Sequence, residues 1–172
     1  MKPSLADTLC TRCGLCCDGS LFADVELASR DEIAALEVLG LDVEDTDETG
    51  AGLLLQPCRA LKGKRCSIYP HRPECCRTFE CQLLRQVKSG AVSIARAREK
   101  IAEALKCIKS VQQLIDDLPQ SNERLPLKER CTEALALSEE AGADTEMIRK
   151  RAQLQIAMTS VENLIQKTFL GG

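Results

Sequence analysis

Aromatic side chains are scarce in this sequence. Its 172 residues include four, Phe22, Tyr69, Phe79 and Phe169, and no tryptophan. Because aromatic side chains normally bury the most apolar area each, a core without them must rest on Leu, Ile, Val and Ala and on some further source of stability. A bound metal is the source that the rest of the sequence favours.

Two other absences narrow the function. No apolar run approaches the roughly 20 residues of a membrane span, and the first ten residues lack the apolar segment of a secretory signal. We therefore expect a cytoplasmic protein that makes no contact with a membrane. His71 is the only histidine, which leaves one position for histidine-based catalysis; we expect it to be a solvated loop residue.

Cysteine, by contrast, is abundant. Nine of the eleven cysteines lie between Cys10 and Cys81, and only Cys107 and Cys131 lie beyond. In a reducing compartment such a pattern is more typical of metal or redox chemistry than of disulfides, and an odd count does not close into pairs. A lone cysteine is usually a small buried hydrophobe, but this density predicts thiolates that bind metal.

Charge is distributed unevenly. Residues 1–50 carry three basic and twelve acidic side chains, whereas residues 51–100 carry eleven basic and three acidic ones. We expect the basic stretch to act on a metal site of the same chain rather than on nucleic acid. A four-thiolate metal site carries a net charge of about −2 and is stabilised by nearby cations. Arg72 and Arg77, among the cysteines, are the candidates. Pairing of these arginines with the acidic first fifty residues is an equal alternative.

The first cysteine cluster has the spacing of a metal-binding loop. Cys10, Cys13 and Cys16 are each separated by two residues, as in the run that supplies three ligands to a [4Fe–4S] cluster, and the same spacing serves zinc. Cys17 follows directly. Adjacent side chains of an extended chain point to opposite sides, so we expect Cys16 and Cys17 to serve two sites, or two metals of one cluster.

The second cluster begins at Cys58 and Cys66, and Cys75, Cys76 and Cys81 then fall within seven positions. Together, the two clusters resemble the bacterial CxxCxxCC cysteine-cluster family, described as a zinc- or iron-chelating domain. The resemblance covers roughly residues 7–85 and leaves out the tail from about Val92. The matching segments are CTRCGLCC at 10–17, PCRAL at 57–61, CSIYPHRP at 66–73 and CRTFEC at 76–81.

The resemblance implies a set of eight metal ligands. They are Cys10, Cys13, Cys16, Cys17, Cys58, Cys66, Cys76 and Cys81. Cys75 is an addition to the family pattern, so the choice between Cys75 and Cys76 stays open. We expect the eight to converge in space, with Cys107 and Cys131 apart from them as packing residues. A related domain occurs in flagellin lysine methylases, which makes a protein-methylation enzyme a further alternative.

Local patterns predict the elements of the first half. Residues 7–19 are expected to form a cysteine-dense loop, and Ser29 with Glu32 forms a capping box that opens a helix ending at Gly40. Residues 42–50 should be an acidic loop. Short strands at 53–55 and 65–69 can form a hairpin, and a helical stretch should follow Pro73 to about Lys88.

The second half has heptad periodicity. Apolar residues recur every seven positions from Ile94 to Ile115, and again from Ala97 to Leu118, which predicts a long helix ending before Pro119. Further helices are expected from about Leu127 to Ala141 and from about Asp144 to Phe169. We expect the first and third of these helices to pack antiparallel within the chain; a dimer is the alternative.

These observations combine into one prediction. The fold class is α+β and mostly helical, with a small metal-stabilised, Cys-rich module and short hairpin at 1–88, followed by a helical bundle at 89–172. The favoured function is an iron–sulfur protein for redox, sensing or metal handling. The alternative is a structural zinc module that presents its helices to a protein partner. A non-enzymatic role is favoured, and we assign no catalytic residue.

Overall fold

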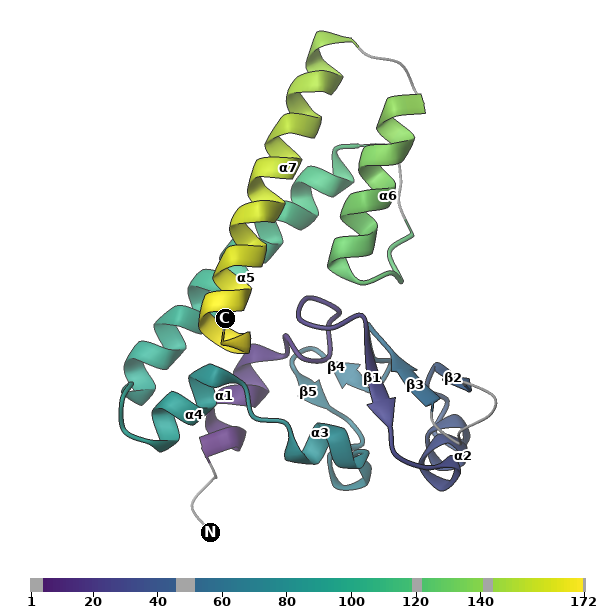
Figure 1. Ribbon diagram of the computed structural model, residues 1–172, viewed down its shortest axis with the longest axis vertical. Helices are drawn as coiled ribbons and strands as arrows, with labels where there is room; N and C mark the ends of the chain where they lie inside the picture. Colours follow the sequence, from purple (N-terminus) through teal and green to yellow (C-terminus); the bar gives the residue numbers. More distant parts are fainter. Residues whose placement is uncertain (1–4, 46–51, 119–121, 141–143, 172) are drawn as a thin grey trace. The chain divides into compact units, whose positions relative to one another are not determined.

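The computed structural model describes residues 5–45, 52–118, 122–140 and 144–171 (Figure 1). These residues are mostly helical with two small antiparallel sheets, which confirms the predicted fold class. The chain divides into two compact units, Met1–Glu80 and Cys81–Gly172. Within the described ranges, no helix is long and apolar enough to cross a membrane.

A three-stranded antiparallel sheet lies at the centre of the first unit (Figure 1). Strand β3 (Gly52–Leu55) lies between β1 (Asp24–Leu27) and β2 (Val43–Asp45), and Leu54 of β3 is opposite Val25 on one side and Val43 on the other. The predicted strand at 53–55 is confirmed. The acidic segment contains strand β2, which the prediction of a loop missed, and its residues from 46 to 50 lie outside the described ranges.

The predicted hairpin between residues 53–55 and 65–69 is wrong. The two-stranded sheet instead joins β4 (Leu61–Lys62) to β5 (Arg65–Cys66) around Gly63, whose φ of 63° suits a residue without a side chain. Beyond Cys66 the chain turns into a 3-10 helix, η1 (Tyr69–His71). Pro70 lacks the N–H that a continuing strand would need.

Helix α2 (Arg30–Val38) begins and ends as predicted. The Ser29 hydroxyl accepts the N–H of Glu32, the Glu32 carboxylate accepts the N–H of Ala28, and Gly40 follows the helix with a φ of 75°. The buried Ile33 of α2 packs so close to β3 that a residue with a side chain does not fit at Gly52. A Cβ atom at Gly52 would lie 2.6 Å from the Ile33 Cδ1 atom, so the sheet and helix fit closely only with glycine there.

The predicted loop at residues 7–19 is wrong in its first half, because Leu5–Cys13 forms helix α1. Leu9 is buried, with Asp7 in the first turn and Arg12 in the last, a charge order that suits the helix dipole. Gly14 ends α1 with a φ of 76°, and its N–H donates to the Cys10 carbonyl oxygen. The closely spaced cysteines and the glycines of this segment are typical of a loop, so the sequence did not predict helix α1.

The helical stretch after Pro73 is interrupted. It consists of α3 (Glu74–Thr78) and α4 (Gln82–Lys88), separated by extended backbone at Phe79 and Cys81. The break coincides with the boundary between the two units.

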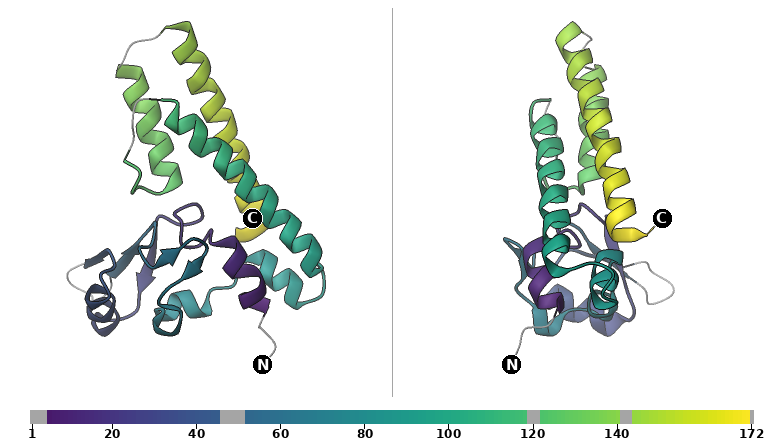
Figure 2. Two further views of the ribbon diagram at one scale, coloured as in Figure 1. Left: turned by 180° about the vertical axis from the view of Figure 1, so that it is seen from behind. Right: turned by 90° about the vertical axis from the view of Figure 1, so that its left-hand side faces the viewer.

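Long helices form the second unit. They are α5 (Ile94–Asp116), α6 (Leu127–Glu140) and α7 (Thr145–Ile165), the last followed by the π-helical turn η2 (Gln166–Leu170). Helices α5 and α7 run antiparallel side by side, as predicted, and α6 packs against both (Figures 1 and 2). The buried seam of α5 consists of Ala97, Ile101, Ala104, Ile108, Val111 and Ile115, whereas Ile94 is 38% exposed.

Candidate metal centre

Four cysteine side chains of the first unit act on one another electrostatically. Cys17 interacts with Cys58 and Cys66, and Cys76 interacts with Cys17 and Cys58. They come from four separate segments: the turn after α1, the residues after β3, strand β5 and helix α3. Cys58 is 9% exposed and belongs to the core, and the other three pack against that core. We call these four residues the thiol cluster.

A backbone hydrogen bond links the two cysteine-rich segments. The N–H of Cys58 donates to the carbonyl oxygen of Cys17 at 2.8 Å, and the same N–H lies 3.1 Å from the Oε1 atom of Gln56. Gln56 is itself buried, at 5% exposure. Hydrogen bonds of buried groups are costly to lose, so these contacts hold Cys17 beside Cys58 through the main chain.

Three thiols of this cluster, those of Cys17, Cys58 and Cys76, favour the protonated form when no metal is bound. Burial, and then the neighbouring thiols of Cys58 and Cys66, raise the pKa of Cys17 to about 12. Burial, followed by Cys75, also raises the pKa of Cys76, and burial raises that of Cys58. A metal must therefore displace protons from these sulfurs in order to bind.

The predicted cationic neighbour Arg72 lies at this cluster. Its guanidinium stacks 3.7 Å from the centre of the Tyr69 ring, and it donates to the carbonyl oxygens of Tyr69 and Cys76 at 3.1 and 3.3 Å. Its charge also lowers the pKa of Cys17, against the larger effect of burial. Arg59, which was not part of either expectation, forms a 2.6 Å ion pair with Asp42 of the acidic segment.

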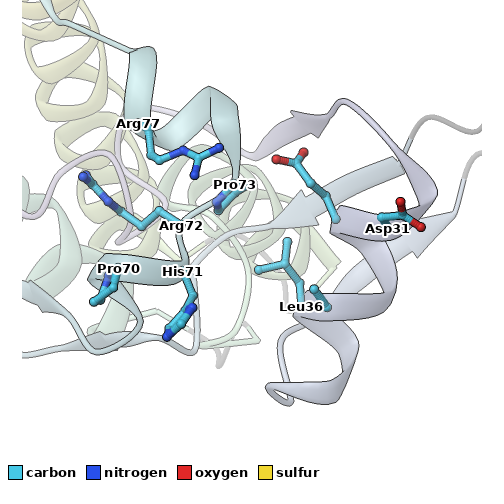
Figure 3. Close-up of a pocket in the computed structure, with 9 residues that line it drawn as sticks. Asp31, Leu36, Pro70, His71, Arg72, Pro73 and Arg77 are labelled. Carbon is cyan, nitrogen blue, oxygen red and sulfur yellow. The ribbon is translucent and has the colours of Figure 1, made fainter.

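Arg77, like Arg72, lines an open pocket between α2 and the segment from Pro70 to Arg77 (Figure 3). Figure 3 shows Arg72 and Arg77 on one side of this pocket and Asp31 on the other, with Leu36 between them. His71 is exposed at its edge, as expected for a solvated residue.

Two acidic residues at the edges of the site escaped prediction. The Tyr69 hydroxyl donates to the Asp7 carboxylate at 3.0 Å, which ties α1 to η1. The Glu32 carboxylate accepts the N–H of Glu74 at 2.7 Å, which ties α2 to α3. The capping box identified Glu32 as a helix cap. No local signal in the sequence indicated that its second carboxylate oxygen accepts the N–H of Glu74, or that Asp7 accepts the hydroxyl of Tyr69.

The remaining cysteines among the expected ligands lie in α1, in the turn after it and at the start of the second unit. Cys10 and Cys13 lie in the last turns of α1, and Cys16 follows Gly14. Cys81 belongs to the second unit, where its sulfur accepts the N–H of Leu84 at the start of α4.

Cys107 and Cys131 lie in helices of the second unit, and Cys131 is buried there among apolar residues, as expected of a packing residue. Across the described ranges, no three His, Cys, Asp or Glu side chains are already spaced to hold a metal ion. Binding therefore requires the thiols to draw closer together.

A model of the CxxCxxCC family, described as a "putative zinc- or iron-chelating domain", matches residues 9–131. The chain belongs to the CxxCxxCC family. The match runs through α5 to Cys131, so the expectation that the tail from about Val92 lies outside the family is wrong for residues 92–131, and the match does not extend to residues 132–172. Neither the curated proteins nor the solved structures that were compared gave a match.

The donor set of this CxxCxxCC domain fits a thiophilic metal. Thiolate sulfur is the preferred ligand of zinc and of iron–sulfur clusters, and four thiols lie in or against the core of the first unit, near enough to interact but not yet spaced to hold a metal. The N–H groups of Ala60 and Leu61 act on Cys58 and oppose the rise of its pKa, as donors to a metal-bound sulfur would. Arg72 adds a compensating positive charge.

Proposed function

We propose that this protein holds an iron–sulfur cluster on its cysteine thiolates, and that Cys17, Cys58, Cys66 and Cys76 act as one ligand set. The observation that carries the proposal is that these four side chains, drawn from four separate segments, lie in or against one core, where Cys66 and Cys76 each interact with both Cys17 and Cys58. Such a cluster supplies one-electron redox chemistry, which suits a role in electron transfer, sensing or metal handling.

Three features favour iron–sulfur chemistry. The spacing of Cys10, Cys13 and Cys16 is that of cluster-binding runs. The Arg72 guanidinium balances negative charge at Cys17, and backbone N–H groups act on the Cys58 sulfur. Hydrogen bonds and nearby cations of this kind stabilise a cluster and set its reduction potential.

The choice between the two adjacent cysteines of α3 favours Cys76 as the ligand. Cys76 interacts with Cys17 and Cys58, whereas the interactions of Cys75 are with Cys76 and Glu32. In the full proposal the remaining ligands are Cys10, Cys13, Cys16 and Cys81, so that the adjacent Cys16 and Cys17 serve different ligand sets. Arg72 acts as the supporting cation, and Arg77 is a second one.

A structural zinc module is the second candidate. The burial of Cys58 favours it, because structural zinc sites are closed four-coordinate sites without an open position. In this role the metal would stabilise the first unit, and the helices would contact a protein partner. The exposed Ile148 and Ile156 on α7 are apolar residues that such a partner could cover.

Metal and sulfide analysis of the full chain, purified without oxygen, distinguishes these candidates. The proposal predicts a brown protein with broad visible absorption that contains iron and acid-labile sulfide. A colourless protein that contains zinc and no sulfide would establish the zinc candidate instead. A protein that retains neither metal, after reconstitution with each, would overturn both.

A further inference from the structure

Cys75 is the cysteine of this region that is not among the eight expected metal ligands. It lies beside Cys76 on α3, and their two sulfur atoms are 4.0 Å apart. Both side chains are half-buried and pack against the core of the first unit. A second thiol therefore adjoins one that we assign to the metal.

The two sulfurs have different neighbours. Cys76 interacts with Cys17 and Cys58 of the thiol cluster, whereas the neighbouring charge that acts on Cys75 from outside α3 is that of Glu32. Successive side chains of a helix project about 100° apart, which explains this divergence. Cys75 thus lies outside the thiol cluster but within reach of one of its members.

A bond between these sulfurs would be reversible. Successive Cα atoms are about 3.8 Å apart, below the range of about 4.4–6.8 Å in ordinary disulfides, so a disulfide between adjacent residues is strained. Strained disulfides are easily reduced again and are typical of regulatory pairs. Helix α3 has five residues and no side-chain cap at Pro73, so a local change of its backbone disrupts little regular structure.

We propose that Cys75 and Cys76 form a redox pair through which a hydroperoxide releases the metal from the thiol cluster; this inference rests on the proposed assignment of Cys76 as a ligand. The Cys75 sulfur attacks the peroxide, an S–O bond forms as the O–O bond breaks, and an alcohol leaves, or water when the peroxide is hydrogen peroxide. The Cys76 sulfur then attacks the resulting sulfenic acid. An S–S bond forms and the S–O bond breaks, and the hydroxide that leaves takes a proton from solvent to become water, because the metal-bound Cys76 thiolate carries no proton.

Two electrons thus pass from the thiol pair to the peroxide. The metal loses Cys76 as a ligand, and a dithiol reductant regenerates both thiols.

The test uses the full chain loaded with Zn²⁺, because zinc undergoes no redox change and any release then reports on the thiols. Hydrogen peroxide is added in small excess, released zinc is followed with a chromophoric chelator, and disulfides are mapped by mass spectrometry. We expect the first disulfide to join Cys75 to Cys76. In Cys75→Ser, zinc content before oxidation should be unchanged and release should be roughly tenfold slower, because the thiol that attacks the peroxide is absent.

Either of two results would overturn the inference: a first disulfide between other cysteines, or equal release from Cys75→Ser and the unchanged protein. Mapping in the metal-free chain keeps this test separate from the proposed function. If Cys76→Ser retains its zinc while the metal-free parent chain still forms the disulfide, the ligand assignment has failed and the link to metal release fails with it. Cys75→Ala, checked by circular dichroism, serves if the serine variant does not fold.

Discussion

The backbone N–H of Cys58 donates a 2.8 Å hydrogen bond to the carbonyl oxygen of Cys17. This contact joins the two cysteine-rich segments through the main chain rather than through a metal. The N–H is shared with the Oε1 atom of the buried Gln56. Main-chain pairing therefore fixes the two segments in register before metal binds, and the thiols need smaller movements to coordinate it.

Gln56→Ala should weaken this register. It removes a buried acceptor and leaves a small cavity, so we expect a loss of about 1–3 kcal/mol in the free energy of unfolding and weaker metal binding. Denaturant titration of the metal-loaded chain measures the first effect. Gln153→Ala, an exposed residue of α7, is the control and should change neither quantity. Equal stability of the two variants would contradict this role of Gln56.

Glu32→Ala should loosen the first unit from the side of α2. The carboxylate accepts the N–H groups of both Ala28 and Glu74, and its loss should cost about 1–2 kcal/mol. Hydrogen exchange should rise at the Glu74 amide in particular. Glu37→Ala, at an exposed position of the same helix, should leave that amide unchanged. Equal exchange at the Glu74 amide in both variants would contradict a stabilising role for the hydrogen bond between Glu74 and Glu32.

Metal affinity should rise with pH throughout the neutral range. Burial raises the pKa of Cys17 to about 12 and also raises the pKa values of Cys58 and Cys76, so at every pH below these values protons compete with the metal. Lowering the pH adds bound protons and weakens binding, and raising it does the reverse. Chelator competition for Zn²⁺ between about pH 6.5 and 8.5 tests the sign. An affinity independent of pH would mean that the thiols are already ionised.

In the helical unit, the loss of stability caused by a substitution to alanine should depend on how buried the replaced side chain is. Leu154 of α7 is fully buried, so Leu154→Ala should cost about 2–5 kcal/mol. Ile156, two residues on, is 69% exposed, and Ile156→Ala should cost less than about 0.5 kcal/mol. Thermal unfolding of both variants checks the difference. Similar costs would mean that α7 does not pack as described.

Elements set by local signals could be predicted from the sequence. Ser29 and Glu32 start α2, and the heptad seam from Ala97 to Ile115 specifies both α5 and its buried face. These patterns depend on residues within a few positions of one another. Helix α1 was not predicted, because its cysteines and the following Gly14 are typical of a metal-binding loop, and Leu9 alone does not indicate a helix.

Contacts between distant segments could not be predicted in the same way. Strand β1 and the pairing of β4 with β5 depend on partners that no local pattern specifies. For the site, spacing and family resemblance predicted the cysteines, but not which of them meet. The division at residue 88 and the ligand roles of all eight cysteines stay predictions.

Metal content per chain, measured after purification without oxygen, tests the central claim most directly. The unchanged protein should carry its metal, Cys58→Ser should lose it because a buried member of the thiol cluster is removed, and Cys107→Ser should retain it because that residue lies on α5. Equal metal content in the two variants would contradict the claim that Cys17, Cys58, Cys66 and Cys76 bind metal together.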